Sequence, residues 1–199
     1  MKTPRRPLGP AATLWLHGTL FILVILADQI TKYWVRLRYS LPGGEPDYFL
    51  STPVIGDWLQ FRLVYNHGAA FGTKPQSLLP FLSPMVFFMI FTVIAIGCLA
   101  YYYYRLGARE KTARLGVLLI LAGAVGNLID RMAMQKVTDF IDAGIPGVSP
   151  RWPVFNIADS SVCIGILLML LPPFFSGKKE NPAPAGLAEN SREGDSHAG

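Results

Sequence analysis

Carboxylic acids in or beside long apolar runs are the residues of this chain whose type and placement could do chemistry. They are Asp28, Asp130, Asp139 and Asp159. A charged residue at the centre of a membrane helix costs roughly 2.5–3.5 kcal/mol on insertion scales, so each needs a structural or functional reason. Two carboxyl groups in one apolar, water-accessible pocket cannot both ionise easily, and such a pair shares a proton. A pair of this kind can activate water as a general base and protonate a leaving amine as a general acid.

Spacing alone does not choose which two of the four carboxylates form a pair, but their neighbours favour Asp139 and Asp159. Asp130 is followed by Arg131, and a nearby cation favours an ionised, paired carboxylate. Asp139 has apolar neighbours and no adjacent cation, and Asp159 lies inside an apolar run. Asp142 is followed by Ala-Gly and is expected to be more exposed. The alternative role of Asp159 is a hydrogen bond to a neighbouring helix.

Other polar residues are expected to support such a pair. Asp28 and Lys32 are four residues apart, which places them on one helical face where they can form an ion pair. A salt bridge at a helix end, with the lysine reaching the membrane interface, is an equally good interpretation of these two. Asn127 and Asn156 each precede a carboxylate by three residues, so each shares a helical face with that carboxylate. Both amides could hydrogen-bond the pair or a scissile carbonyl.

The composition indicates that the elements positioning these residues are membrane helices. Hydrophobic residues make up 51% of the 199 residues and charged residues only 16%, whereas a soluble domain carries about a quarter charged residues. The apolar residues form blocks long enough to cross a hydrocarbon core of about 30 Å. We expect an all-α integral membrane protein with four transmembrane helices. The expected spans are 11–36, 78–104, 112–132 and 153–175, within a membrane domain of residues 11–176.

The segment between the first two helices is expected to form a small extracytoplasmic β-structure at about residues 40–72. Residues 57–65, DWLQFRLVY, are aromatic and partly alternating, which favours short strands outside the bilayer core. Lys and Arg are more numerous in the terminal segments and in the 105–114 loop than on the opposite side. This bias predicts that both termini are cytoplasmic, with the carboxylates near the outer face. Residues 1–10 and 177–199 are the expected cytoplasmic terminal segments, the second of them disordered.

Several other classes of protein are disfavoured. The sequence has no HExxH motif, no Cys/His cluster and no phosphate-binding GxxxxGK[ST] motif, so no metal and no cofactor are expected. Cys98 and Cys163 lie in apolar runs and give no disulfide framework. The net charge is +5, but the basic residues flank apolar blocks, which indicates orientation in a membrane rather than binding of nucleic acid.

Three alternatives to an aspartic peptidase remain at this point. Intramembrane carboxylates also occur in proton relays, so a small transporter or proton-conducting protein is the first of them. The polar residues cluster near one membrane face, without a polar path through the second and fourth helices, which disfavours that alternative. A non-catalytic lipid-binding or scaffold protein would tolerate Asp139→Asn. A metallopeptidase would lose activity on chelation.

Five blocks, in this order along the chain, carry a resemblance to a known family. They are Asp28-Gln29-x-x-Lys32, Asn66-His67-Gly68-Ala69-Ala70-Phe71, Gly126-Asn127-Leu128-Ile129-Asp130-Arg131, Val137-Thr138-Asp139-Phe140 and Phe155-Asn156-Ile157-Ala158-Asp159. Together they resemble bacterial lipoprotein signal peptidase, or signal peptidase II, over about residues 12–175. Thr138 departs from the family, in which a second valine is common at this position.

The resemblance implies an intramembrane aspartic endopeptidase that removes signal peptides from prolipoproteins, cutting before a diacylglyceryl-modified cysteine. It implies that Asp139 and Asp159 are the catalytic dyad, which agrees with the charge argument, and that a β-cradle follows the first helix. The residues it implies as site support and substrate contacts are Asp28, Lys32, Asn66, Gly68, Asn127, Asp130, Arg131 and Asn156. The expected partners are diacylglyceryl-modified prolipoproteins and membrane lipid, without nucleic acid, and the protein is expected to be a monomer.

Overall fold

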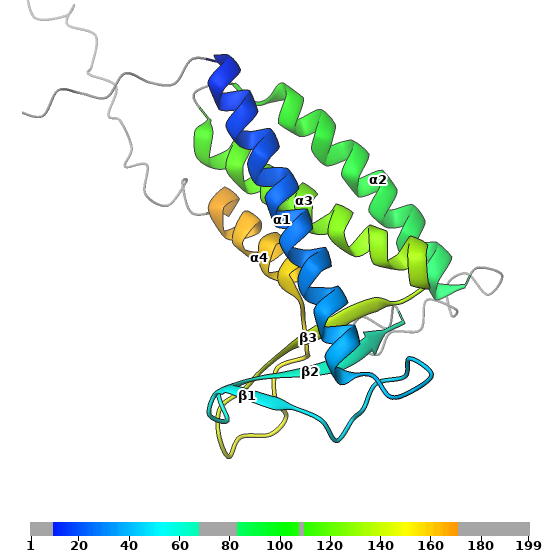
Figure 1. Ribbon diagram of the computed structural model, residues 1–199. Helices are drawn as coiled ribbons and strands as arrows, with labels where there is room; N and C mark the ends of the chain where they lie inside the picture. The colour runs from blue at the N-terminus through cyan, green and yellow to red at the C-terminus, as the bar shows by residue number, and fades with distance from the viewer. Residues whose placement is uncertain (1–9, 68–82, 108–109, 171–199) are drawn as a thin grey trace, which may run out of the picture.

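A bundle of helices with a small sheet at one end makes up the structure, a computed structural model that describes residues 10–67, 83–107 and 110–170. The helices are α1 (Pro10–Tyr39), α2 (Pro84–Arg105), α3 (Lys111–Met134) and α4 (Ile157–Leu170). Helix α3 packs against the other three helices, while α1 also contacts α4 (Figure 1). The bundle is therefore organised around α3, which holds three of the predicted site residues.

Three of these helices are long and apolar enough to cross a membrane. They cover Thr13–Tyr39, Met85–Arg105 and Lys111–Met134. Large apolar side chains on α1 and α2 point outward, among them Ile30 and Phe91, as expected for helices surrounded by lipid. Helix α4 is apolar but has only 14 described residues, and residues 171–175 of the predicted fourth span lie outside the described residues. The membrane-helix class is confirmed, and the fourth span stays a prediction.

Glycines bring α3 and α4 into backbone contact. A Cβ atom placed on Gly116 would lie 2.7 Å from the carbonyl oxygen of Gly165, and one on Gly165 would lie 2.5 Å from the carbonyl oxygen of Gly116. Small residues at a helix interface allow this close approach in membranes. The same contact places the first turn of α4, which carries Asp159, beside the polar end of α3.

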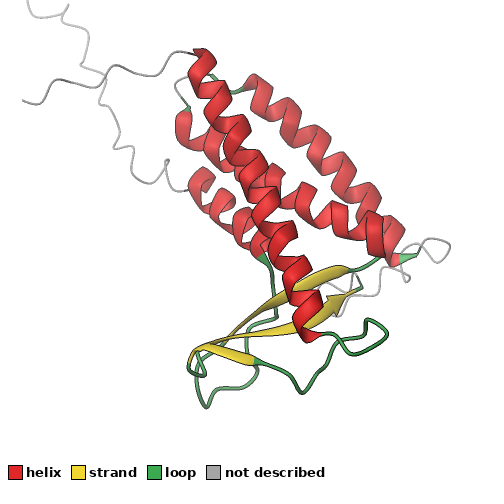
Figure 2. Ribbon diagram, in the orientation of Figure 1, coloured by secondary structure: helices red, strands yellow, loops and turns green. Residues whose placement is uncertain are grey.

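The sheet lies at the end of the bundle where α1 and α3 finish (Figure 2). Its antiparallel strands, in the order β1-β2-β3, are β1 (Thr52–Ile55), β2 (Leu59–Asn66) and β3 (Val137–Ala143). Strands β1 and β2 lie in the predicted β-segment, of which residues 68–72 are outside the described residues. Strand β3 comes from the stretch between α3 and α4 that was predicted as a loop. Its residues are largely buried, so the half-exposed alternation that marks a strand in sequence is missing.

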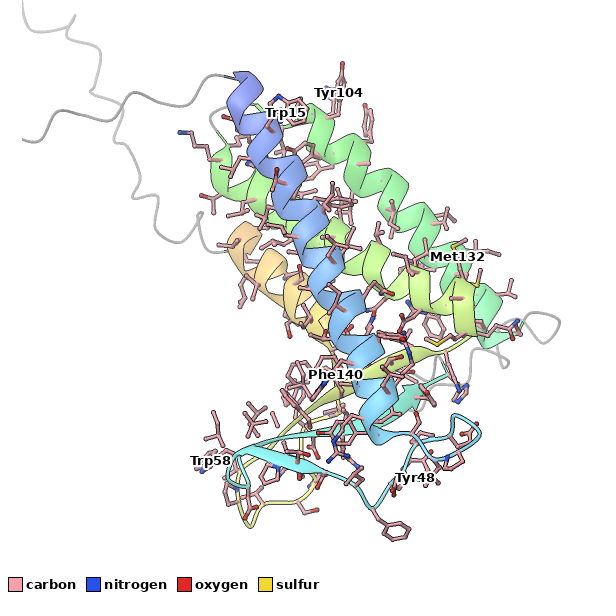
Figure 3. The ribbon with its side chains drawn as sticks, in the orientation of Figure 1. Trp15, Tyr48, Trp58, Tyr104, Met132 and Phe140 are labelled. Atoms are coloured by element: carbon pink, nitrogen blue, oxygen red, sulfur yellow. The ribbon has the colours of Figure 1, made fainter. Side chains whose placement is uncertain are left out.

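The last turns of α1 anchor the sheet to the bundle. Val35 and Tyr39 of α1, Leu63 of β2 and Phe140 of β3 form one buried apolar cluster. Figure 3 shows Phe140 beside the end of α1 that reaches the sheet. This cluster fixes β3 against α1 directly next to Asp139.

Residues ahead of α4 are extended rather than helical. The backbone N–H of Phe155 donates to Ile141 O at 3.1 Å, and the N–H of Ile141 donates to Phe155 O at 2.7 Å. Helix α4 therefore begins at Ile157, later than the predicted start at residue 153. The pairing of Phe155 with β3 takes the place of an earlier helical turn.

Candidate active site

Polar side chains from four elements meet where α1, α3 and the start of α4 approach β3. Among the described residues, the buried polar and charged side chains at this junction include Asp28, Lys32, Asn127, Asp130, Thr138, Asp139 and Asn156. Buried polar groups are costly unless they are hydrogen-bonded, so their partners define what the site can do.

Asn156 directly precedes α4 and organises the junction. Its side-chain oxygen accepts from the backbone N–H of Asp159 at 2.9 Å, and the Asp159 carboxylate accepts from the backbone N–H of Asn156 at 3.1 Å. This reciprocal arrangement has the pattern of a helix capping box, with a carboxylate in the third helical position. The spacing of the two residues predicted a shared helical face, and the cap fixes the Asp159 side chain in place.

The same asparagine reaches the second carboxylate. Its amide nitrogen donates to Asp139 Oδ1 at 2.7 Å, while its backbone nitrogen donates to Asp159 Oδ2. Asn66 at the end of β2 donates to the other oxygen of Asp139 at 3.2 Å. Asp139 and Asp159 are therefore held on either side of one residue and interact electrostatically.

Burial sets the charge state of Asp139. Loss of water around this carboxyl group, and to a smaller extent the neighbouring Asp159 charge, raise its pKa to about 7. The hydrogen bonds from Asn66 and Asn156 and the charge of Lys32 act against this rise. Near neutral pH, Asp139 is thus able to hold or release a proton, as a group that shares a proton with a second carboxylate must.

Asn127 of α3 supports Asp159 and is itself held by a lysine. Its amide nitrogen donates to Asp159 Oδ1 at 2.8 Å. Its amide oxygen accepts from Lys32 Nζ at 2.9 Å and from Asn156 Nδ2 at 3.1 Å. Because an ammonium group can only donate, Lys32 determines which end of the Asn127 amide faces Asp159.

Lys32 is itself enclosed by two carboxylates. Its ammonium group lies 2.8 Å from Asp28 Oδ2 and 3.5 Å from Asp130 Oδ2, and the side chains of all three residues have at most 1% of their surface exposed. Asp28 also accepts from the backbone N–H of Ala158 at 2.9 Å, and Asp130 accepts from the N–H of Thr138 at 2.8 Å. The ion pair predicted from the four-residue spacing is present, and it also holds the start of α4 and the start of β3.

Gln29 is a positioning residue to which the sequence interpretation gave no role. Its amide nitrogen donates to the backbone oxygen of Gly126 at 3.0 Å, to Asp28 Oδ2 at 3.1 Å and to Asp130 Oδ1 at 3.3 Å. It thereby joins α1 to α3 at the ion-pair cluster of Asp28, Lys32 and Asp130. Its place directly after Asp28, in the block Asp28-Gln29-x-x-Lys32, was the sequence signal for this role.

Two predicted environments differ from the structure. Asp142 was expected to be exposed, but it is buried and its carboxylate lies 2.8 Å from Arg62 Nε and 2.8 Å from Arg151 Nε. Asp130 was expected to pair with Arg131, but its nearest ion-pair partner is Lys32, because sequence neighbours on a helix point in different directions. Arg131 interacts electrostatically with Asp130, Asp139 and Asp159. Gly68 lies outside the described residues.

In the described ranges, no group of three or more His, Cys, Asp and Glu side chains is arranged to hold a metal ion. The site instead consists of two carboxylates with amide donors, and an ion-pair cluster behind them.

Comparison with known proteins decides the family. A family model described as Signal peptidase (SPase) II matches residues 20–175. The lipoprotein signal peptidase of Bacillus velezensis is 37% identical over 166 residues, which is 83% of this chain and 98% of that relative. The chain belongs to the signal peptidase II family.

Solved structures agree with this assignment. Two structures of a bacterial membrane enzyme are 33% and 31% identical to the chain, and each has a TM-score of 0.67. They cover 84% and 81% of this chain, and the matches span 93% and 94% of those chains. Membership of signal peptidase II confirms the predicted family and the predicted class of enzyme, an aspartic endopeptidase. It also supports a place in a bacterial inner membrane, in agreement with the apolar helices.

Proposed function

We propose that the chain removes signal peptides from prolipoproteins with Asp139 and Asp159 as its catalytic pair. The observation that carries this proposal is the position of Asn156, which donates to Asp139 through its side chain and to Asp159 through its backbone. The cut would fall before the diacylglyceryl-modified cysteine of the precursor.

The chemistry follows from one proton shared between two carboxyl groups. The ionised carboxylate takes a proton from a water molecule, whose oxygen attacks the scissile carbonyl carbon. The protonated partner donates to the carbonyl oxygen as negative charge develops there. When the C–N bond breaks, the pair gives a proton to the leaving amine and takes one back from a hydroxyl of the tetrahedral intermediate, so that the products are a free carboxyl group and a free amine. The pair ends with one proton, as it began.

The surrounding residues keep the pair in this state. Asn66 and Asn156 provide neutral donors to Asp139, which orient the carboxyl group without locking it in the ionised form. Lys32 acts through Asn127, whose amide then faces Asp159. Asp28 and Asp130 neutralise the lysine and fix the backbone at Ala158 and Thr138, so these two acids are positioning residues. Arg131 and Gly68 are proposed substrate contacts.

We place the site at the outer face of the membrane. The sheet packs at the same end of the bundle as the carboxylate pair and would form the outer cradle over the substrate. The proposed topology has four spans within residues 11–176, with residues 1–10 and 177–199 in the cytoplasm. The lipid-modified substrate would approach from the bilayer, and one chain would suffice for activity.

Cleavage of a diacylglyceryl-modified prolipoprotein by the purified chain tests the proposal. Asp139→Asn and Asp159→Asn should each abolish turnover while the protein is still produced and folded. Asp57→Asn is the matched control, because Asp57 is an exposed acid at the β1–β2 turn, away from the pair. Near-normal cleavage by either of the first two variants would rule out the pair.

The transporter alternative is not favoured, since the chain belongs to a peptidase family. Proton or solute flux through vesicles that contain the purified chain should equal the flux of empty vesicles.

A further inference from the structure

A second feature of the bundle lies at the end away from the sheet. An apolar groove of about 380 Å³ opens between the start of α1, the end of α2 and the first half of α3. Apolar residues line it, among them Leu14, Trp15, Phe21, Leu118 and Leu121. The lining belongs to helices that cross the membrane, so the groove faces hydrocarbon rather than water. Its size and lining fit a length of acyl chain.

Polar groups stand at one side of this groove. His17 Nδ1 and the Tyr103 hydroxyl are joined by a hydrogen bond of 2.7 Å, and both residues line the groove. The Arg114 guanidinium lies over the Tyr103 ring, with 4.8 Å between its Cζ atom and the ring centroid. The Nε atom of Arg114 is buried and has no hydrogen-bond partner among the residues that the structure describes. A donor in that state is suited to an acceptor that the chain itself does not supply.

The level of the groove in the membrane follows from its neighbours. Trp15 and Tyr104 lie at the same end of the bundle (Figure 3), and both are largely exposed. Exposed Trp and Tyr rings at a helix end are typical of the membrane–water interface. Arg114 lies in the first turn of α3, so its guanidinium is at the depth of lipid headgroups. The nearby carboxylate of Glu110 is engaged by the backbone N–H of Gly107 at 2.6 Å.

We propose that this groove binds an anionic phospholipid of the surrounding bilayer, with an acyl chain along the apolar lining and the phosphate at Arg114. The Tyr103 hydroxyl and His17 supply further polar contacts to the headgroup. The site is distinct from the carboxylate pair, because it lies at the opposite end of the helices. It holds a resident lipid and takes no part in peptide cleavage.

The test uses the fluorescence of Trp15, which lines the groove. A full-length chain with Trp34, Trp58 and Trp152 replaced by Phe keeps Trp15 as its only tryptophan. It is reconstituted into phosphatidylcholine vesicles that contain increasing fractions of brominated phosphatidylglycerol or brominated phosphatidylcholine. Half-maximal quenching should need about fivefold less of the anionic lipid, the factor expected for one basic residue near a headgroup. Equal curves for the two lipids would overturn the proposal.

Two pairs of variants separate the headgroup contact from the acyl-chain contact. Arg114→Gln should remove the preference for the anionic lipid, whereas Arg105→Gln, an exposed arginine at the end of α2, should keep it. Gly18→Leu should fill the groove and reduce quenching by both lipids. Gly97→Leu is its control, because a Cβ atom meets nothing within 4 Å at either glycine and only Gly18 lines the groove.

Further readouts distinguish the proposal from other outcomes. Inorganic phosphate at millimolar concentration should leave the lipid preference unchanged. If phosphate abolished the preference, the site would be one for a free anion instead. A preference that survives Arg114→Gln would contradict the assigned headgroup contact. Cleavage of prolipoprotein in detergent should be the same for all four variants, which also shows that each is folded. The measured lipid preference does not depend on whether Asp139 and Asp159 are the catalytic pair.

Discussion

Two buried carboxylates on strand β3, Asp139 and Asp142, have opposite surroundings. Their exposed fractions are 3% and 1%. Asp142 is held between the guanidinium groups of Arg62 and Arg151, each 2.8 Å away. Asp139 receives neutral amide donors and lies beside another carboxylate.

The contrast shows that burial alone does not make a carboxyl group reactive. Two adjacent cations pair with the Asp142 carboxylate, which ties the sheet to the loop before α4. Asp139 is left without a direct cation, and loss of water together with the Asp159 charge raises its pKa to about 7. The choice of partner, amide or guanidinium, thus distinguishes Asp139 from the ion-paired Asp142 three positions further along the strand.

The largest expected effect comes from replacing each acid in turn. Asp139→Asn should lower kcat/KM by at least about 10³-fold, because the pair loses its general acid–base partner. Asp142→Asn should change kcat/KM of the folded protein by less than about threefold, but should lower stability by about 1–3 kcal/mol. The loss stays moderate because Arg62 and Arg151 remain partly in contact with water. Prolipoprotein cleavage and thermal unfolding in detergent measure the two effects.

At pH 8, the stabilities of the two variants should differ from that of the parent in opposite directions. The pKa of Asp139 in the folded chain lies above its ordinary value of 3.8, so its contribution to stability is complete below about pH 4 and is lost as the pH rises through about 7. Asp139→Asn should therefore unfold at a higher temperature than the parent at pH 8, and this gain should shrink toward pH 5. Asp142→Asn should be less stable than the parent at both pH values. A lower unfolding temperature for Asp139→Asn at pH 8 would contradict the assigned environment.

Much of the site could be predicted from sequence, because several of its contacts are local. The four-residue spacing of Asp28 and Lys32 predicts their ion pair, and the three-residue spacing of Asn156 and Asp159 predicts that they share a face. Charges inside apolar runs also indicated the junction where these side chains meet. What spacing could not supply is that Asn156 contacts Asp139, since that contact depends on β3 reaching the start of α4.

The predicted environment of Asp142 was wrong for a related reason. Ala143 and Gly144 after it suggested exposure, but a Cβ atom on Gly144 would lie only 2.9 Å from the Arg151 guanidinium. The missing side chain allows Arg151 to lie across the strand and cover Asp142. The glycine that suggested exposure therefore makes burial possible, and only the folded chain shows which distant residue uses the space.

The next-largest effect concerns Lys32, the cation that acts on the carboxylate pair through Asn127. Lys32→Met should destabilise the protein by about 3–5 kcal/mol, because Asp28 and Asp130 then lie buried without it. It should also lower kcat/KM, since the Asn127 amide is free to turn away from Asp159. The double variant Lys32→Met with Asp28→Asn should recover part of the stability but not the activity. Recovery of both would mean that Lys32 serves only to neutralise Asp28.

A smaller effect compares two amides of β2, each of which donates to one of the acids. Asn66 donates to Asp139 at 3.2 Å, and Gln60 donates to Asp142 at 3.1 Å. The parent should lose kcat/KM above about pH 7, as Asp139 gives up its proton. Asn66→Ala should move this alkaline limb to higher pH, because the lost hydrogen bond lowered the pKa of Asp139. Gln60→Ala should leave the pH–rate profile in place, and an equal shift in both variants would remove the distinction between the two acids.

The smallest effect concerns how many cations Asp142 needs. The Arg62 side chain is 38% exposed, and Arg151 contacts the same carboxylate and also donates to the backbone oxygen of Asp57 at 2.7 Å. Arg62→Gln should therefore cost no more than about 1 kcal/mol, since an exposed ion pair contributes little and Asp142 keeps its second guanidinium. Arg151→Gln should cost more, because it removes both the ion pair and the tie to the β1–β2 turn. Thermal unfolding of the two variants measures the difference. Equal losses would mean that Asp142 is held by charge alone, and that the link from Arg151 to the turn contributes nothing to the rigidity of the strand that carries Asp139.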